Sequence, residues 1–508
     1  MAEVRRSRMR RILLILTGIA TVLALVVGGG VTWIYTSADV STVGTMDFDQ
    51  ELSIPPLADA TVEADGTRVF QLDMRSGKKE FEPGRLVRTW GFNGDYLGPT
   101  LRARRGEQVR VRVRNQLEEA STVHWHGMHL PASMDGGPHQ MVDSGGTWTP
   151  EWKVDQAAAT LWYHPHPHGA TESHVRKGLA GMFLIDDDAS SALPLPHDYG
   201  VNDLPLIVQD VKFSGDRFAT GRGMFADVGF LGDRTMVNGT LAPFREVGDE
   251  LVRLRLLNAS TARVYNFGFS DDRAFALIGT DGGLLEQPAE MNSVQLSPGE
   301  RAEIVVRMRA GERVQLRSAN AGMGLDFWSR RFSGGDDRFD ILELRAATTL
   351  RPSPPLPTAL VSARLPEASE SVRERTFTLE FGKINGQAMA MDRIDATVTR
   401  GTVETWVVRN EDGMPHNFHV HDVQFAVTEY GGKAPPAALR GPKDTIFLPP
   451  GGSATLALRF DGPADPSTPY MFHCHLLWHE DLGMMGQFVV VDPGQEAAPP
   501  APAHHSGH

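Results

Sequence analysis

Residues 473–484 read His473-Cys474-His475-Leu476-Leu477-Trp478-His479-Glu480-Asp481-Leu482-Gly483-Met484, and they include the only cysteine among 508 residues. A lone cysteine forms no disulfide within its own chain, so this sulfur is not a structural cross-link. Two imidazoles, one thiolate and a weak axial thioether are the ligands of a blue copper site. We therefore interpret Cys474, His479 and Met484 as copper ligands, in preference to the alternative that Cys474 is only a buried small apolar side chain.

The two histidines beside Cys474 indicate a second metal centre. Neighbouring side chains of an extended strand point to opposite faces, so His473 and His475 are expected to face away from the sulfur. A blue site uses only one of those faces. The pattern predicts a metal cluster directly behind the first site, joined to it through the peptide units around Cys474.

Three more His-x-His pairs supply ligands for that cluster. Residues i and i+2 of a strand share a face, so each pair presents two imidazoles to one cluster. The pairs are His124 and His126, His164 and His166, and His419 and His421; His416 precedes the last pair and completes the blue site. Because no histidine occurs between Asp198 and Pro415, we expect the two ends of the chain to meet and the middle third to serve as a spacer or scaffold.

These four motifs resemble the copper-binding motifs of the multicopper oxidases, and the resemblance runs from about residue 50 to residue 492. It implies four copper ions per chain: one of type 1, one of type 2 and a type 3 pair. It implies a type 1 ion on His416, Cys474, His479 and Met484, a type 2 ion on His124 and His419, and a type 3 pair on His126, His164, His166, His421, His473 and His475. His168, the third histidine of its run, is interpreted as lying outside this set.

An internal repeat predicts several domains of one kind. A glycine turn followed by alternating apolar and polar residues, and closed by asparagine, occurs at residues 105–115, 247–258 and 400–410. Such alternation is typical of a strand that is buried on one face. The copies are about 150 residues apart, which is the length of a whole domain. With 52 glycines and 33 prolines punctuating short strands, the sequence predicts an all-β chain of three β-sandwiches.

The family resemblance refines this division. It implies three cupredoxin-like Greek-key β-sandwich domains, with the copper cluster between the first and the third. We predict an arginine-rich tip and membrane segment over residues 1–45, and sandwiches over residues 46–190, 191–350 and 351–492, the last carrying the type 1 copper. Residues 493–508 are rich in proline and alanine and are predicted to be disordered.

The N-terminus predicts export from the cytoplasm. Residues 12–35 carry no charge, and as a helix they are about 36 Å long, enough to cross a hydrocarbon core of about 30 Å. The arginines before them keep the N-terminus in the cytoplasm and place the rest of the chain outside. Thr36-Ser37-Ala38 offers a cleavage site, so two alternatives stay open: an uncleaved membrane anchor, and a signal whose removal leaves a secreted or periplasmic enzyme.

The predicted reaction is the oxidation of small reductants by O₂. A substrate gives electrons one at a time to the type 1 copper, Cys474 passes them on to His473 and His475, and the cluster reduces O₂ to two waters after four have arrived. Asp135 and Glu480 match acidic positions that the family uses near the cluster and its water channels, and for each the alternative is an ordinary surface carboxylate. They are the predicted proton carriers.

The substrate is less closely defined by the sequence. Asp412 and Met414 lie just before His416, at positions that resemble those where copper-efflux oxidases bind cuprous ions, but the methionine-rich insertion of those enzymes is absent from residues 352–373. We expect a monomeric oxidase that accepts phenols, Cu(I) or Fe(II). A net charge of −13 argues against nucleic-acid partners. The alternatives are a copper-sequestering resistance protein with secondary turnover and a copper-free relative, which the complete ligand set disfavours.

Overall fold

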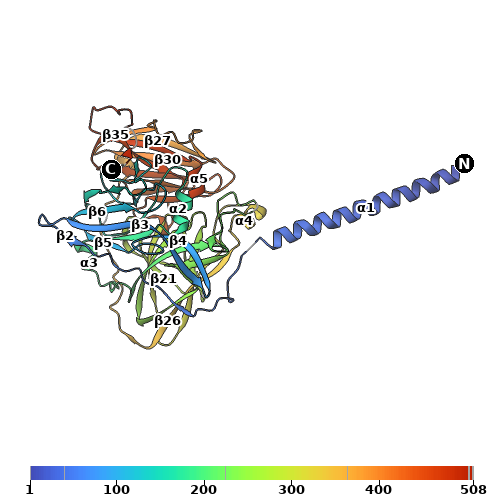
Figure 1. The fold of residues 1–508 in the computed structure, drawn as a ribbon, viewed down its shortest axis with the longest axis horizontal. Coiled ribbons are helices and arrows are strands. Elements are labelled where there is room, and N and C mark those ends of the chain that lie inside the picture. The colour runs from blue at the N-terminus through green and yellow to red at the C-terminus, as the bar shows by residue number, and fades with distance from the viewer. Residues whose placement is uncertain (1, 39, 224, 363, 501–503, 506–508) are drawn as a thin grey trace.

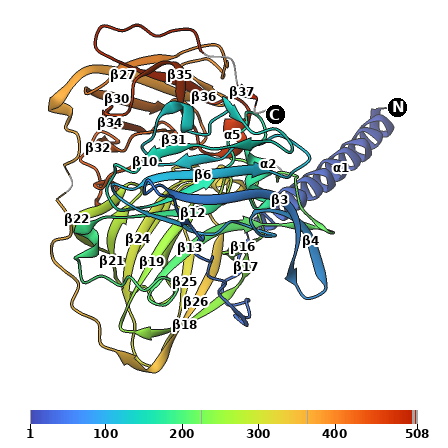
Figure 2. The same ribbon diagram turned by 60° about the vertical axis from the view of Figure 1, so that its left-hand side comes forward.

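The computed structural model describes residues 2–38, 40–223, 225–362, 364–500 and 504–505. Its strands form three pairs of sheets, so the predicted all-β architecture of three sandwiches is confirmed. The third sandwich lies at one end, the first in the middle and the second at the other end, as the red, blue and green-to-yellow strands of Figures 1 and 2 show.

The first sandwich is built from strands of the N-terminal third. They are β2 (Thr61–Val62), β3 (Arg68–Glu82), β4 (Arg85–Phe92), β5 (Leu101–Arg104), β6 (Gln108–Asn115), β7 (His124–His126), β9 (Thr147–Trp148), β10 (Glu151–Lys153), β11 (Ala159–His164) and β12 (Gly181–Asp186). One sheet has the order β10-β6-β3-β2, with β4 on β3 and β9 on β6, and the other has the order β5-β12-β11-β7. The second of these sheets carries His124, His126 and His164, and His166 follows just after β11.

The second sandwich contains the largest sheet, which has seven strands. Its strands are β1 (Gln50–Glu51), β13 (Asp203–Val211), β16 (Arg234–Val237), β17 (Thr240–Leu241), β18 (Pro243–Asp249), β19 (Leu251–Asn258), β20 (Tyr265–Phe269), β21 (Phe275–Thr280), β22 (Gly283–Met291), β23 (Ser293–Leu296), β24 (Arg301–Arg307), β25 (Arg313–Ala319) and β26 (Arg338–Arg351). The orders are β1-β18-β26-β25-β20-β23 and β17-β16-β13-β19-β24-β21-β22. Although residues 46–190 were predicted as the first domain, β1 pairs with β18 of this second sandwich.

The third sandwich completes the chain. Its strands are β27 (Ser371–Glu380), β28 (Lys383–Ile384), β29 (Ala396–Thr399), β30 (Val403–Asn410), β31 (His416–Val420), β32 (Phe425–Tyr430), β33 (Thr445–Leu448), β34 (Ser453–Arg459), β35 (Asp465–His473) and β36 (Met485–Val491). The orders are β28-β27-β30-β34-β32 and β29-β36-β35-β31-β33. In the second sheet, β31 and β35 are neighbours with His419 opposite His473, and His421 and His475 follow just after these strands.

Short elements connect these sheets. The helices are α1 (Ala2–Thr36), α2 (Thr171–Lys177), α3 (Asp188–Ser191), α4 (Phe327–Phe332) and α5 (Leu477–Asp481), and the 3-10 turns are η1 (Ala132–Met134), η2 (Ala368–Glu370) and η3 (Ala437–Leu439). Strands β14 (Phe213–Ser214) and β15 (Arg217–Phe218) form a hairpin. In the tail, where disorder was predicted, β37 (His504–His505) pairs with β8 (Gln140–Met141), and residues 501–503 and 506–508 lie outside the described residues.

The repeated asparagine has the same structural task in each sandwich. Its side-chain NH₂ donates to backbone carbonyls of the following loop and of a neighbouring strand, and its side-chain oxygen accepts from the amide two residues further on. These residues are Asn115, Asn258 and Asn410, at the ends of β6, β19 and β30. In the third sandwich this turn begins the loop that leads to His416.

Each sandwich encloses its own apolar core. The core of the third includes Cys474 and Met484, both fully buried, and also Val228 and Ala262 from the second sandwich. The segment around Cys474 therefore lies where two sandwiches meet.

Helix α1 projects away from the sandwiches (Figure 1). It is the one helix among the described residues that is long and apolar enough to cross a membrane, over Val4–Thr36, and its apolar window is buried by nothing else in the chain. Beyond α1 the chain runs along the second sandwich, where the Val40 amide donates to Asp337 Oδ1 at 2.8 Å.

Candidate metal centre

Strand pairing brings the four histidine pairs to one place. In the first sandwich, β7 and β11 pair antiparallel, with His124 opposite His164. In the third, β31 and β35 pair with His419 opposite His473. The imidazoles of the two sandwiches meet across their interface, where the His126 ring stacks on that of His419 at 3.8 Å and the His124 ring on that of His421 at 3.8 Å.

The mononuclear site lies on one side of Cys474. Its Sγ is 3.7 Å from Nδ1 of both His416 and His479, and those two nitrogens are 3.0 Å apart. The opposite ring nitrogens are engaged elsewhere: Nε2 of His479 donates to the Asp227 carbonyl at 2.8 Å. The Cys474 amide donates to the carbonyl of Met484 at 3.1 Å, which keeps that buried residue beside the sulfur's own backbone.

One half of the cluster is formed by three Nε2 atoms. His166 Nε2 lies 3.0 Å from His473 Nε2, which lies 3.2 Å from His421 Nε2. The Nδ1 atoms of His421 and His473 face acceptors, Asp135 Oδ2 at 2.7 Å and the Cys474 carbonyl at 3.1 Å, so they carry the ring protons. Their Nε2 atoms therefore present bare lone pairs to one another, an arrangement that a cation between them stabilises.

The other half of the cluster is formed in the same way. His164 Nε2 lies 3.4 Å from His126 Nδ1 and 3.4 Å from His475 Nε2. His164 Nδ1 donates to the Pro165 carbonyl at 2.8 Å, so its Nε2 carries no proton. Cys474 thus lies between the two halves, because His473 before it belongs to the half with His166 and His475 after it belongs to the half with His164.

His124 and His419 offer two further free nitrogens. Nδ1 of His124 donates to the Asp135 carbonyl at 3.0 Å, and Nδ1 of His419 donates to the Asp444 carbonyl at 2.9 Å. The Nε2 atom of each ring is buried and has no hydrogen-bond partner in the described chain. A buried acceptor without a partner is costly, and a metal ion satisfies it.

The ionisation of these groups suits copper. Burial lowers the pKa of His166 to about 4 and that of His475 to about 3, so both rings are neutral and able to ligate. Burial raises the pKa of the Cys474 thiol to about 12, so the thiolate forms only when a cation shares its site. Thiolate with imidazole on one side and imidazoles alone on the other is the donor set of a copper protein.

Asp135 and Glu480, the two predicted proton carriers, lie next to the Nδ1 atoms of the cluster histidines. Besides its contact with His421, Asp135 has Oδ1 3.4 Å from His124 Nδ1. Glu480 lies with Oε1 3.5 Å from His166 Nδ1 and Oε2 3.3 Å from His473 Nδ1. Burial acts to raise the pKa of Glu480, but the imidazoles of His166 and His473 outweigh it and lower the pKa. Both carboxylates are buried, so neither is an ordinary surface group.

The predicted substrate residues lie at the rim of the mononuclear site. Asp412 Oδ2 is 3.3 Å from His416 Nε2, and this hydrogen bond lowers the pKa of Asp412 to about 2. Met414 is partly exposed in the same loop. Across the site, the Phe381 ring is 39% exposed and packs on Trp478 and His479, with ring centroids 5.1 and 5.2 Å apart. The rim therefore offers one carboxylate and one open aromatic face.

His168, which was predicted to lie outside the ligand set, is exposed, away from the buried ligands.

The middle third of the chain reaches both metal centres, so it is more than a spacer. Asp227 supplies the carbonyl on His479, and Gly299 lies so close to His475 that a Cβ there would be 3.1 Å from its ring. Arg301 pairs with Asp444 at 2.6 Å, and Asp444 Oδ1 lies 3.1 Å from His126 Nε2. The sequence offered no signal for these contacts, because none of these residues belongs to a histidine motif.

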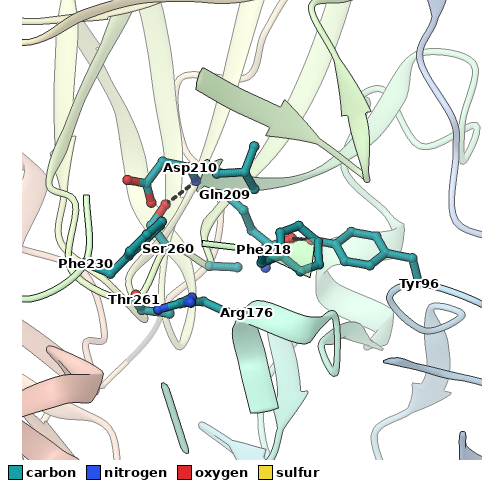
Figure 3. Close-up of a pocket in the computed structure, with 10 residues that line it drawn as sticks. Tyr96, Arg176, Gln209, Asp210, Phe218, Phe230, Ser260 and Thr261 are labelled. Carbon is teal, nitrogen blue, oxygen red and sulfur yellow. Dashed lines mark hydrogen bonds between the residues drawn. The ribbon is translucent and has the colours of Figure 1, made fainter. Parts of the chain in front are cut away.

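A small cavity lies beside the loop that carries Asp227 (Figure 3). Phe218 and Phe230, near the two ends of that loop, line it together with Tyr96 and Arg176. The Arg176 guanidinium donates to the Ala219 carbonyl and covers the Phe230 ring at 4.1 Å. The cavity lies outside the histidine cluster, and its lining holds the loop against the first sandwich.

Comparisons with known proteins agree with this site. Three family models, each described as multicopper oxidase, match residues 73–190, 162–317 and 358–494. The multicopper oxidase mco of Staphylococcus haemolyticus is 35% identical over 448 residues, which are 87% of this chain and 93% of that protein. The cell division protein FtsP of Salmonella typhimurium is 37% identical over 456 residues, with the same two shares.

Solved structures show the same likeness. A laccase-like multi-copper oxidase, CueO from Ochrobactrum sp., has 35% identity and a TM-score of 0.79, over 87% of this chain and 100% of that one. A multicopper oxidase from Campylobacter jejuni, described as a metallo-oxidase, has 25% identity and a TM-score of 0.74, over 89% of this chain and 98% of that one.

Proposed function

The chain belongs to the multicopper oxidase family, with its cupredoxin-like fold and copper oxidoreductase chemistry, and we propose that it carries electrons singly from small reductants to O₂ through Cys474. The observation that carries this proposal is the position of that residue. Its sulfur faces the mononuclear site, 3.7 Å from His416 and His479, while the adjacent His473 and His475 enter the two halves of the cluster.

The geometry supports the ligand assignment implied by the motifs. His416, Cys474 and His479 would hold the type 1 ion, with Met484 kept beside them by its backbone hydrogen bond. His166, His421 and His473 would hold one type 3 ion, and His126, His164 and His475 would hold the other. The unpartnered Nε2 atoms of His124 and His419 would hold the type 2 ion. Four copper ions, when bound, would supply the four electrons needed to reduce O₂ to two water molecules without release of partly reduced oxygen.

The chain's own residues have three tasks in this reaction. Cys474 gives a covalent path between the two centres through its bonds to His473 and His475. The Asp227 and Asp412 contacts orient the two imidazoles of the mononuclear site. Asp135 and Glu480 hold or accept protons next to the cluster, where O₂ reduction consumes them.

The rim supports broad substrate use. Asp412 is anionic at neutral pH and attracts Cu(I) or Fe(II), with Met414 as a soft ligand nearby. The open face of Phe381 suits the ring of a phenol. Comparison of kcat/KM for Cu(I) and for a phenol in Asp412→Asn separates these uses, because asparagine keeps an oxygen that can accept from His416 Nε2 but lacks the negative charge that attracts cations.

Replacement of the sulfur tests the proposal. Cys474→Ser keeps the size of the side chain and removes the thiolate, so we expect loss of the blue absorption and of O₂ consumption. Copper bound by the cluster histidines should remain, which shows that the variant has folded. Retained turnover would refute the role of Cys474 as the path for electrons.

The relatives named for cell division raise a second candidate, a structural role in cell division without oxidase turnover. FtsP is as similar to this chain as the oxidase mco is, so identity alone does not choose between the two activities. The converging lone pairs and the complete ligand set favour the oxidase. Oxygen uptake by the purified, copper-loaded protein separates an oxidase from a copper-sequestering or structural protein, since only the oxidase consumes O₂ when a reductant is added.

The relatives named for cell division and the helix α1 also inform the proposed location of the protein. We propose that the oxidase works outside the cytoplasm, as a monomer held to the membrane by an uncleaved α1. The contacts of Tyr35 with the second sandwich support the uncleaved form, because cleavage after residues 36–38 would remove them.

A further inference from the structure

The outer end of α1 is packed against α4 of the second sandwich. The ring of Tyr35 stacks on that of Phe327, with centroids 4.7 Å apart, and lies 5.6 Å from the ring of Trp328. The Arg331 guanidinium lies 4.7 Å from the same tyrosine ring, and its Nε donates to the Tyr35 carbonyl at 2.7 Å. The helix therefore meets the folded part of the chain at a built contact, and not through a free linker.

The length of α1 sets the depth of this contact in a membrane. The uncharged residues 12–35 span about 36 Å as a helix, and a hydrocarbon core is about 30 Å thick. If the arginines at one end stay in the cytoplasmic interface, Tyr35 lies at the outer boundary of the hydrocarbon. Because α4 touches Tyr35, α4 lies at the level of the outer lipid headgroups.

Large aromatic side chains are exposed at that level. Phe327 is 67% exposed, Trp328 is 37% exposed and Phe225 is 53% exposed. The ring of Phe332 joins them, since it lies 5.1 Å from Trp328 and 5.3 Å from Phe225. We call Phe225, Phe327 and Trp328 the aromatic seat. Exposed aromatic rings are costly in water but favourable at a membrane interface.

The loop that carries Phe225 also reaches the mononuclear site, whose opening is the rim formed by Asp412, Met414 and Phe381. Two residues after Phe225, Asp227 supplies the carbonyl that accepts from His479. In the same loop, Arg222 covers the Trp478 ring at 3.7 Å. In Figure 1, α4 and α5 both lie on the side of the molecule from which α1 extends.

We propose that the aromatic seat rests in the outer headgroup layer of the membrane that α1 crosses, and holds the opening of the mononuclear site at the membrane surface. This inference rests on the proposed uncleaved anchor. An electron donor that partitions into the headgroup layer then meets the opening at a raised local concentration.

Cysteine labelling tests this placement, because the native Cys474 is fully buried and an introduced surface thiol reacts selectively. Phe327→Cys and Phe225→Cys are each labelled with an environment-sensitive fluorophore in the full, copper-loaded chain, which is then placed in lipid nanodiscs. Val62→Cys is the matched control, since Val62 is 63% exposed on β2, at the opposite end of the molecule in Figure 1. Nanodiscs with and without a lipid spin-labelled near the headgroup are compared.

We expect the spin-labelled lipid to remove most of the emission from positions 327 and 225 and to leave that from position 62 unchanged. Co-purification of the chain with the nanodisc reports separately on α1. If the chain stays in the nanodisc while positions 327 and 225 are no more quenched than position 62, the seat is refuted and the anchor stands. If the chain does not enter the nanodisc, both the anchor and the seat are refuted.

Discussion

At the scale of single residues, the Cys474 sulfur faces His416 and His479, while His473 and His475 on either side of it enter the histidine cluster. The alternation of a strand predicted this from the sequence, and the eight paired histidines were also recognisable, since their spacing alone places each pair on one face. Asp444 and Asp227 were not predictable. The Asp444 carboxylate contacts His126 and the Asp227 carbonyl accepts from His479, each more than 200 positions away, and neither aspartate belongs to a motif of its own.

Residues 164–168, His-Pro-His-Pro-His, contain two histidines that can be replaced as a matched pair. His166 is buried among the Nε2 atoms of the cluster, whereas His168 is exposed. We expect His166→Ala to lower copper content and abolish O₂ consumption, because one ion loses a ligand. His168→Ala should match the wild type in both. Metal analysis and oxygen-electrode assays of the two variants check this, and equal losses would remove the distinction between the two histidines.

Asp135 is expected to affect proton delivery. Asp135→Asn keeps an oxygen near His421 Nδ1 but loses the proton carrier, so kcat should fall about 10²-fold or more and its pH dependence should change. Asp188→Asn is the control, because that carboxylate is fully exposed. An unchanged rate and pH profile in Asp135→Asn would show that its role is only to hold His421.

At the scale of elements, the repeat strands β6, β19 and β30 were predictable because their alternation and closing asparagine follow local rules. The pairing of β1 with the second sandwich was not, since two residues carry too little pattern to choose a partner. Strand β24 was likewise not recognised as a contact between sandwiches. Its Arg301 reaches Asp444 of the third sandwich, and its Glu303 accepts from Thr160 of the first at 2.6 Å.

Glu303 gives β24 a stability that depends on pH. Burial acts to raise the pKa of Glu303, but Arg253 and Arg255 outweigh it and lower the pKa from 4.5 to about 2. A carboxylate with a lowered folded pKa stabilises the fold above its unfolded pKa and loses that contribution as the pH falls through its folded pKa. Glu303 therefore loses its stabilising contribution as the pH falls from 4.5 to about 2.

Glu303→Gln should therefore lower Tm most at neutral pH, where breaking a buried ion pair costs about 3–5 kcal/mol. The difference in Tm from the wild type should shrink as the pH falls through the same range. Glu290→Gln, at an exposed position of β22, should show no such trend. Thermal unfolding of the three proteins across pH checks this, and a constant difference would contradict the assigned ionisation.

At the scale of the whole molecule, the three sandwiches enclose their own cores, and α1 contributes no residue to those cores. The sequence predicted both the sandwiches and the apolar segment. It did not predict that α1 would pack on α4, because the contact of Tyr35 with Phe327 joins residues almost 300 positions apart.

Removal of residues 1–37 tests the independence of the folded part. We expect the shortened chain to bind copper and to oxidise a water-soluble phenol with an unchanged kcat, since no ligand or core residue is lost. Copper analysis and steady-state kinetics measure this. A colourless or inactive product would show that α1 contributes to the fold of the sandwiches.

The central claim is that the mononuclear site feeds a cluster that passes four electrons to O₂. The most direct measurement is the ratio of reductant oxidised to O₂ consumed, with peroxide assayed in the same reaction. We predict four molecules of a one-electron reductant per O₂ and no peroxide. A ratio of two, with peroxide formed in equal amount to the O₂ consumed, would contradict it.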